Sequence, residues 1–195
     1  MYPYSFATCK SLIDVNIPEG TRSIFEYAFN QCSGIETLTI PSTVTSISRD
    51  AFSGCTNVKT LNYNVSGKLF FISAYDAEEV FRSMRDSVEN VIIGNKVTEI
   101  FRGMCYGMTK LKDITIPSSV TTFKTLAFAN SGLTRVSYQG TARSWALNSF
   151  NTHSSNPISV AKTLYIDGEP VTKLSMLDSD SYISAYSFYN CQSLT

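Results

Sequence analysis

A repeat of 23 residues is the feature of this sequence that most constrains its fold. Residues 17–39 align with residues 40–62 without a gap. Chains with a fixed repeat of this length form solenoids, in which each unit stacks on the next. The aligned pairs include Pro18 and Pro41, Ala28 and Ala51, Phe29 and Phe52, Cys32 and Cys55, and Leu38 and Leu61.

The repeat accounts for nearly all of the chain once two longer units are allowed. We expect a single solenoid over residues 1–195. Because the sequence begins and ends inside a unit, we also expect it to be a fragment of a longer array. The predicted units are a partial unit, 1–16; regular units, 17–39 and 40–62; an expanded unit, 63–92; regular units, 93–115 and 116–137; an expanded unit, 138–175; and a partial unit, 176–195.

Each unit contains two local patterns. The segment L-x-x-L-x-I-P alternates apolar and polar residues, which predicts a short strand with one buried face. The segment A-F-x-x-C-x-x-L has the spacing of a helical or 3-10 turn. One unit cannot bury its apolar residues alone, so we expect the strands of successive units to form a parallel sheet. The predicted fold class is an α/β repeat solenoid of the leucine-rich-repeat kind, with short helices in the two expanded units.

The first expanded unit predicts a helix from Ala77 to Ser87. Asp76 and Glu79 resemble a capping box in which Asp76 caps the helix. Apolar and charged residues then occupy opposite helical faces. The apolar face holds Val80, Phe81, Met84 and Val88, and the charged face holds the pairs Glu78–Arg82 and Arg82–Asp86.

The second expanded unit predicts a short helix, a loop and a pair of strands. The stretch ARSWALNSF favours a helix that docks Trp145 and Phe150, and a polar loop follows over residues 151–157. LYIDGEPVTKL is typical of a hairpin with an Asp-Gly turn, although residues 164–166 are equally compatible with joining the solenoid sheet. The aromatic residues of the two expansions either contact a ligand or pack the helices down: Phe70, Phe71, Tyr75 and Trp145.

The repeat resembles that of the BspA-like leucine-rich-repeat family, whose unit reads IPxxVTxIxxxAFxxCxxLxxLxIP. The second expansion is similar to a variant unit of that family through residues 138–141, Trp145, Asn156-Pro157 and residues 164–168. The resemblance implies a surface or secreted bacterial protein that adheres to matrix proteins, other cells or glycans. It therefore implies an extracellular or cell-surface location, while the first residues of this chain carry no signal peptide.

Composition argues against several functions. Sixteen basic residues offset 16 acidic ones, so the chain lacks the positive stripe of a nucleic-acid-binding protein. No apolar run reaches the roughly 20 residues that a membrane-inserted helix needs. His153 has no nucleophile or orienting carboxylate in a recognisable motif, so we expect a solvated loop histidine, no enzyme activity and no cofactor.

The cysteines are expected to lie in the core. Cys9, Cys32 and Cys55 recur with the repeat and should stack as small apolar residues, with parallel Cβ directions that disfavour disulfides. Single cysteines so far apart do not have the paired spacing of a zinc site, so no metal is expected. We include Cys191 in this prediction and place Cys105 in the column of phenylalanines.

The polar strand positions are the best candidates for function, because a solenoid sheet offers an extended surface to a ligand. We expect a non-catalytic binding or adhesion module for a protein or glycan. An alternative is a structural spacer whose uncapped ends self-associate; alternating charges on the strands would then only keep the sheet soluble. The candidate ligand-binding residues are Glu36, Thr37, Thr39, Lys59, Thr60, Asn62, Lys112, Asp113, Thr115 and Arg135.

Overall fold

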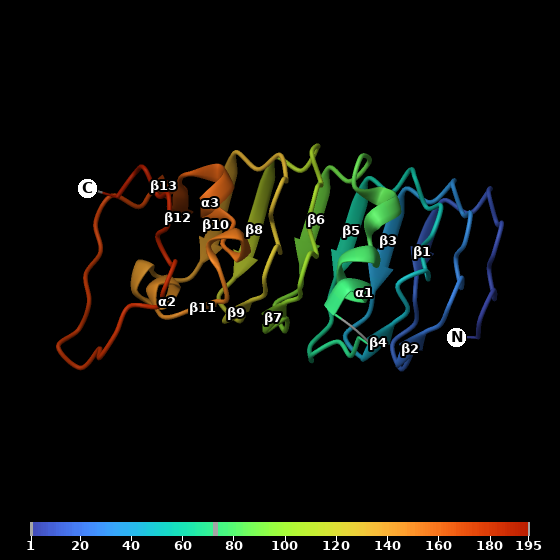
Figure 1. Ribbon diagram of the computed structural model, residues 1–195, viewed down its shortest axis with the longest axis horizontal. Helices are drawn as coiled ribbons and strands as arrows, with labels where there is room; N and C mark the ends of the chain where they lie inside the picture. The colour runs from blue at the N-terminus through green and yellow to red at the C-terminus, as the bar shows by residue number, and fades with distance from the viewer. Residues whose placement is uncertain (1, 72–73, 195) are drawn as a thin grey trace.

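The computed structural model describes residues 2–71 and 74–194, and in it the chain is a solenoid built around one long sheet (Figure 1). The strands of this main sheet pair in parallel, apart from the last pair, which is antiparallel. The predicted fold class is confirmed. In spatial order the strands are β1 (Asp14–Asn16), β3 (Thr37–Ile40), β5 (Thr60–Tyr63), β6 (Asn90–Ile93), β8 (Asp113–Pro117), β10 (Arg135–Gln139), β12 (Leu164–Ile166) and β13 (Glu169–Pro170).

A second row of two-residue strands runs along the lower edge of Figure 1. In the regular units it arises from the VTxI part of the repeat, in the second expansion it arises from Ser149–Phe150, and Phe70 joins it through a single bridge to Ser46. The core lies between this row, the main sheet and the turns that link them. The strands form two groups: β2 (Ser23–Ile24) with β4 (Ser46–Ile47), and β7 (Glu99–Ile100) with β9 (Thr122–Phe123) and β11 (Ser149–Phe150).

The register of the main sheet follows the sequence repeat. Leu38 pairs with Leu61 and Leu61 with Val91, so apolar residues meet apolar residues along the stack. Leu38 and Leu61 are fully buried, whereas their strand neighbours point to the solvent side. Tyr63 pairs with Ile93, which shows that the first expansion lengthens the loop without shifting the faces of the strands.

The turns stack through a column of phenylalanines. The rings of Phe29 and Phe52 are nearly parallel, with centroids 5.5 Å apart, and Phe6 extends the column at 5.3 Å from Phe29. Neighbouring turns also bond through their backbones, as Phe29 N does to Ala51 O at 2.8 Å. The thiols of Cys32 and Cys55 donate to backbone carbonyls of the preceding turn, Cys32 Sγ to Phe6 O at 2.9 Å and Cys55 Sγ to Phe29 O at 3.2 Å. Cysteine is therefore both a small apolar residue and a donor at this position.

The cysteine prediction is correct for the inner units and wrong for Cys9. Cys32, Cys55 and Cys105 are buried, and burial raises the pKa of Cys55 and of Cys105 to about 12. Cys9 is exposed because its turn packs against the following unit on one side only, and Cys191 is half-buried. The thiols of all these residues are free.

The helix predicted for the first expansion is wrong in its bounds and its cap. The chain forms α1 (Ala74–Glu79) and a separate 3-10 turn, η1 (Arg82–Met84), so Asp76 lies in the first turn of α1 and does not cap it. Arg85 Nη2 donates to Glu78 O at 2.6 Å, which occupies a carbonyl that a longer helix would use. The Phe81 ring meanwhile packs against that of Phe52 in a tilted arrangement, with the centroids 6.1 Å apart, so this segment keeps the turn of a regular unit.

The charged pairs predicted on that helix are also rearranged. Arg82 bonds Glu79 at 2.8 Å, Glu78 bonds Arg102 of the next unit, and the predicted pairs with Arg82 at their centre do not form. The four residues predicted on the apolar face are nevertheless buried: Val80, Phe81, Met84 and Val88.

The second expansion contains more regular structure than predicted. The expected helix is α2 (Ala142–Ala146), with Thr141 as its cap, and it ends early because Ser149–Phe150 forms β11. The predicted polar loop holds η2 (His153–Ser155), and α3 (Ile158–Ala161) follows it. Both alternatives for residues 164–166 are realised, because β12 joins β10 in parallel and β13 in a hairpin.

A buried polar network fixes the second expansion to the last part of the chain. Asn156 donates from Nδ2 to the carbonyls of Tyr186 and Ser187, at 2.7 and 2.9 Å, and its Oδ1 accepts from Ile158 N at 2.9 Å. Trp145 Nε1 donates to the same Ser187 carbonyl at 2.7 Å. Trp145 and Asn156 are fully buried, so both act in packing.

Candidate functional site

The polar face of the main sheet carries the predicted site residues in regular columns. Asp14 pairs with Thr37, Thr37 with Thr60, and Thr60 with Asn90, so one such column is continuous over four strands. Arg135 pairs with Asp113 further along the same column. The exposed candidates are Lys59, Lys112, Asp113 and Thr115, and the half-buried ones are Glu36, Thr37, Thr39, Thr60, Asn62 and Arg135.

The first half of this face is paired within itself. Lys59 Nζ lies 3.1 Å from Glu36 Oε2, and Asn62 Nδ2 donates to Thr39 Oγ1 at 3.0 Å. Both contacts join neighbouring strands, and the alternation of charge along the sheet predicts the pair of Lys59 with Glu36. About half of each charged side chain is exposed, so the ion pair contributes little to stability.

Arg135 is held by the hairpin at the other end of the sheet. Its guanidinium carbon lies 3.9 Å from the ring centroid of Tyr165, and its Nη2 donates to Gly168 O at 3.4 Å. This is a cation–π contact within the molecule. Sequence reasoning named Arg135 and missed Tyr165, although an arginine one strand before an aromatic residue is the signal for it.

The joint between β6 and β8 is open. In most units the residue just before the strand donates its amide to its counterpart in the preceding unit. Lys112 makes no such bond to Glu89, and only Ile92 and Thr115 pair across this joint, against five pairs between β8 and β10. The bonds that do form are Glu36 N to Ile13 O at 2.7 Å, Lys59 N to Glu36 O at 2.8 Å, Glu89 N to Lys59 O at 2.9 Å and Thr134 N to Lys112 O at 2.8 Å.

Two surface cavities lie over the open joint. One, of about 430 Å³, lies at the start of the strands, and the other, of about 500 Å³, lies toward their ends. Asn90 and Asp113 line both. The first is also lined by Glu89, Thr109, Lys110 and Lys112, and the second by Thr60, Val91, Ile92, Ile93, Thr115, Pro117 and Gln139.

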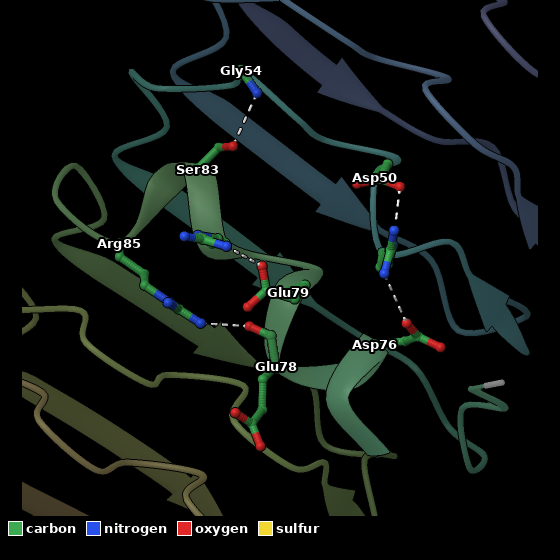
Figure 2. Close-up of polar contacts among 9 residues, drawn as sticks. Asp50, Gly54, Asp76, Glu78, Glu79, Ser83 and Arg85 are labelled. Atoms are coloured by element: carbon green, nitrogen blue, oxygen red, sulfur yellow. Dashed lines mark hydrogen bonds and ion pairs between the residues drawn. The ribbon is translucent and has the colours of Figure 1, made fainter. Parts of the chain in front are cut away.

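The turn side of the same joint is closed. Glu78 forms an ion pair with Arg102, and the guanidinium carbon of Arg85 lies 4.7 Å from the ring centroid of Tyr106. Gly103, at a φ of 69°, lies so close to Glu78 that an added Cβ would be 3.0 Å from the Glu78 Cα. Figure 2 shows Glu78 and Arg85 on the expansion that makes these contacts. The two units are therefore held together at their turns and separated at the start of their strands.

Sequence reasoning placed Lys112, Asp113 and Thr115 at this site but left out Glu89, Asn90 and Gln139. The available signal was the interval from Tyr63 to Ile93, which is 30 residues where the regular units have 23. A change of period in a solenoid marks a joint where stacking differs.

The remaining candidates fall elsewhere. His153 is exposed, with its ring 5.2 Å from that of Tyr189. Phe71 packs against the core and Phe70 is 73% exposed, while the side chain of Tyr75 lies outside the described part of the structure. Within residues 2–71 and 74–194, no three acidic, histidine or cysteine side chains converge as metal ligands do. Over the same residues, no helix has the length and apolar character to span a membrane.

The fold defines a leucine-rich-repeat protein, and comparison with known proteins identifies its family. A model of the BspA type leucine rich repeat region, with six copies, matches residues 1–134 and 77–195. The chain belongs to this family.

Two further comparisons add little to this identification. A crystal structure of a leucine-rich cell surface protein from Faecalibacterium prausnitzii A2-165 is 18% identical, with a TM-score of 0.28. The match covers 76% of this chain and 65% of that one. With so low a TM-score, the family assignment rests on the repeat match. No curated protein matches the chain.

Proposed function

We propose that this protein is a non-catalytic binding module that presents the polar face of its main sheet to a protein or glycan partner. The observation that supports this most directly is the open joint between β6 and β8. Backbone groups that form no cross-strand bond and side chains of both hydrogen-bonding kinds meet there, under cavities of the size that small ligands and side chains occupy.

The chemistry of the joint suits a polar partner without strong net charge. The Lys112 amide donates no bond to the Glu89 carbonyl, so one backbone donor and one backbone acceptor are left without each other at this joint. Two carboxylates, those of Glu89 and Asp113, and the ammonium groups of Lys110 and Lys112 line the first cavity, where Lys112 Nζ donates to Thr109 O at 2.9 Å. A partner that both donates and accepts hydrogen bonds, such as a sugar or an exposed peptide segment, matches this set.

The location that we propose is extracellular or cell-surface, because the family consists mainly of surface and secreted bacterial proteins. Adhesion is the corresponding role, in which the sheet binds a matrix protein, a cell-surface protein or a glycan. A pure spacer would not require an open joint on its sheet face.

Binding of the purified protein to a panel of extracellular-matrix proteins and to a glycan array tests this proposal. For any ligand found, we expect Lys112→Glu and Asp113→Lys to weaken binding by at least about tenfold, as the loss of a charge-assisted hydrogen bond does. Lys96→Glu is the control, because Lys96 is exposed in the turn between β6 and β7. Unchanged binding by the two sheet variants, or equal loss in the control, would contradict the proposal, as would an absence of ligands.

A further inference from the structure

A groove beside the second row of strands has no part in the function proposed above. It encloses about 790 Å³ and is bounded by β2, β4 and the Phe70–Phe71 segment. In Figure 1 these strands lie on the lower edge of the molecule, and they belong to a sheet separate from the main one. Its volume lies within the range of ligand-binding pockets.

Exposed aromatic rings form the rim of the groove. Phe70 is 73% exposed and Phe25 is 46% exposed. Along the strand row, Ser23 pairs with Ser46, and Ser46 pairs with Phe70. Two small side chains therefore line the groove beside Phe70. Two exposed phenylalanines at the border of one concave surface give the groove an apolar rim on which a partner can pack.

The polar lining of the groove is predominantly acidic. Asp50 and Asp76 both contact Arg49, Asp50 Oδ2 at 3.2 Å from Nε and Asp76 Oδ1 at 3.7 Å from Nη1 (Figure 2). Glu26 adds a third carboxylate, exposed at the end of β2. Three carboxylates against one guanidinium leave two negative charges in excess. Arg49 is already shared by two carboxylates, so an anionic ligand would meet net repulsion.

We propose that this groove binds a basic segment of a partner protein. A lysine or arginine side chain of that segment lies across the rings of Phe70 and Phe25, and its cation faces the Glu26 carboxylate. Aromatic faces attract cations, and the excess negative charge of the groove adds to that attraction. This groove shares no lining residue with the cavities on the sheet face. The proposal for the groove therefore holds whether or not the sheet face binds a ligand.

Fluorescence anisotropy with defined peptides tests the proposal. The probe is a labelled peptide, blocked at both ends, in which lysine and arginine alternate with glycine and serine; the reference peptide carries glutamate at each basic position. We expect saturable binding of the basic peptide alone, weakened by salt because the attraction is electrostatic. Phe70→Ser and Glu26→Gln should each weaken it by about fivefold.

Matched controls come from the exposed segment near the end of the chain. Leu177→Ser removes an apolar side chain that is 57% exposed, and Asp178→Asn removes an exposed carboxylate. Both should bind the basic peptide as the unaltered protein does. Equal affinity for the acidic peptide, equal loss in the controls, or no saturable binding would overturn the proposal. None of these results bears on the sheet-face proposal, which is tested separately by Lys112→Glu and Asp113→Lys.

Discussion

Asn156 makes the most stringent prediction about how the second expansion is held. Asn156→Ala removes three hydrogen bonds at a fully buried site. The Ser187 carbonyl keeps its bond from Trp145 Nε1, but the Ile158 amide is left buried without a partner. One buried orphan costs about 1–3 kcal/mol and the lost bond to the Tyr186 carbonyl about 0.5–1.5 kcal/mol, so we expect a loss of about 2–4 kcal/mol in the free energy of unfolding.

Urea unfolding followed by circular dichroism measures this loss, with Asn151→Ala as the control. Asn151 is an exposed asparagine five residues earlier, and its replacement should change the free energy of unfolding by less than about 0.5 kcal/mol. Because the bonds of Asn156 reach residues 186 and 187, the variant should also be cleaved faster by protease within residues 174–183. Equal stability of the two variants would refute this account of the network.

Three further predictions concern the core, the thiols and acid stability. Phe52→Ala should cost about 3–5 kcal/mol in urea unfolding, and Phe6→Ala much less, because Phe52 is 1% exposed and Phe6 is 43% exposed; similar losses would argue against a continuous column. In the native protein a thiol reagent at about pH 8 should modify Cys9 and spare Cys55, whose pKa burial raises to about 12; rapid labelling of both would contradict the packing. The ion pair with Arg143 and the hydrogen bond from the Leu177 amide lower the pKa of Asp180, so the stabilising effect of its carboxylate is present above about pH 4 and is lost as pH falls through the lowered pKa. The melting temperatures of Asp180→Asn and the unaltered protein should therefore converge in acid. A difference that stays constant with pH would be inconsistent with this pair.

The regular part of the fold could be predicted because the period fixes it. Once Leu38 and Leu61 align in the sequence, stacking leaves one register that buries both. The first expansion was harder to predict, because the spacing of Phe81 and Met84 fits a helical face and also fits the A-F-x-x-C turn of a regular unit. Packing of the Phe81 ring against the Phe52 ring of the preceding unit favours the turn.

The candidate site was predictable in its side chains and not in its backbone. Glu89 and Lys112 continue the alternation of charge, so the sequence predicts a closed pair where the structure has an open joint. Backbone separation there depends on how a longer unit closes over its neighbour, which alternating apolar residues do not encode. Cys9 was misplaced for a related reason, since its burial depends on a unit on each side of it.

Amide hydrogen exchange at the residues that precede the strands tests the open joint most directly. We predict slow exchange at Lys59, Glu89 and Thr134, whose amides bond the preceding unit, and fast exchange at Lys112, whose amide does not. Nuclear magnetic resonance resolves these amides individually. Protection of Lys112 equal to that of Lys59 would mean that the sheet is closed between β6 and β8, and the sheet-face site proposed for this protein would lose its main support.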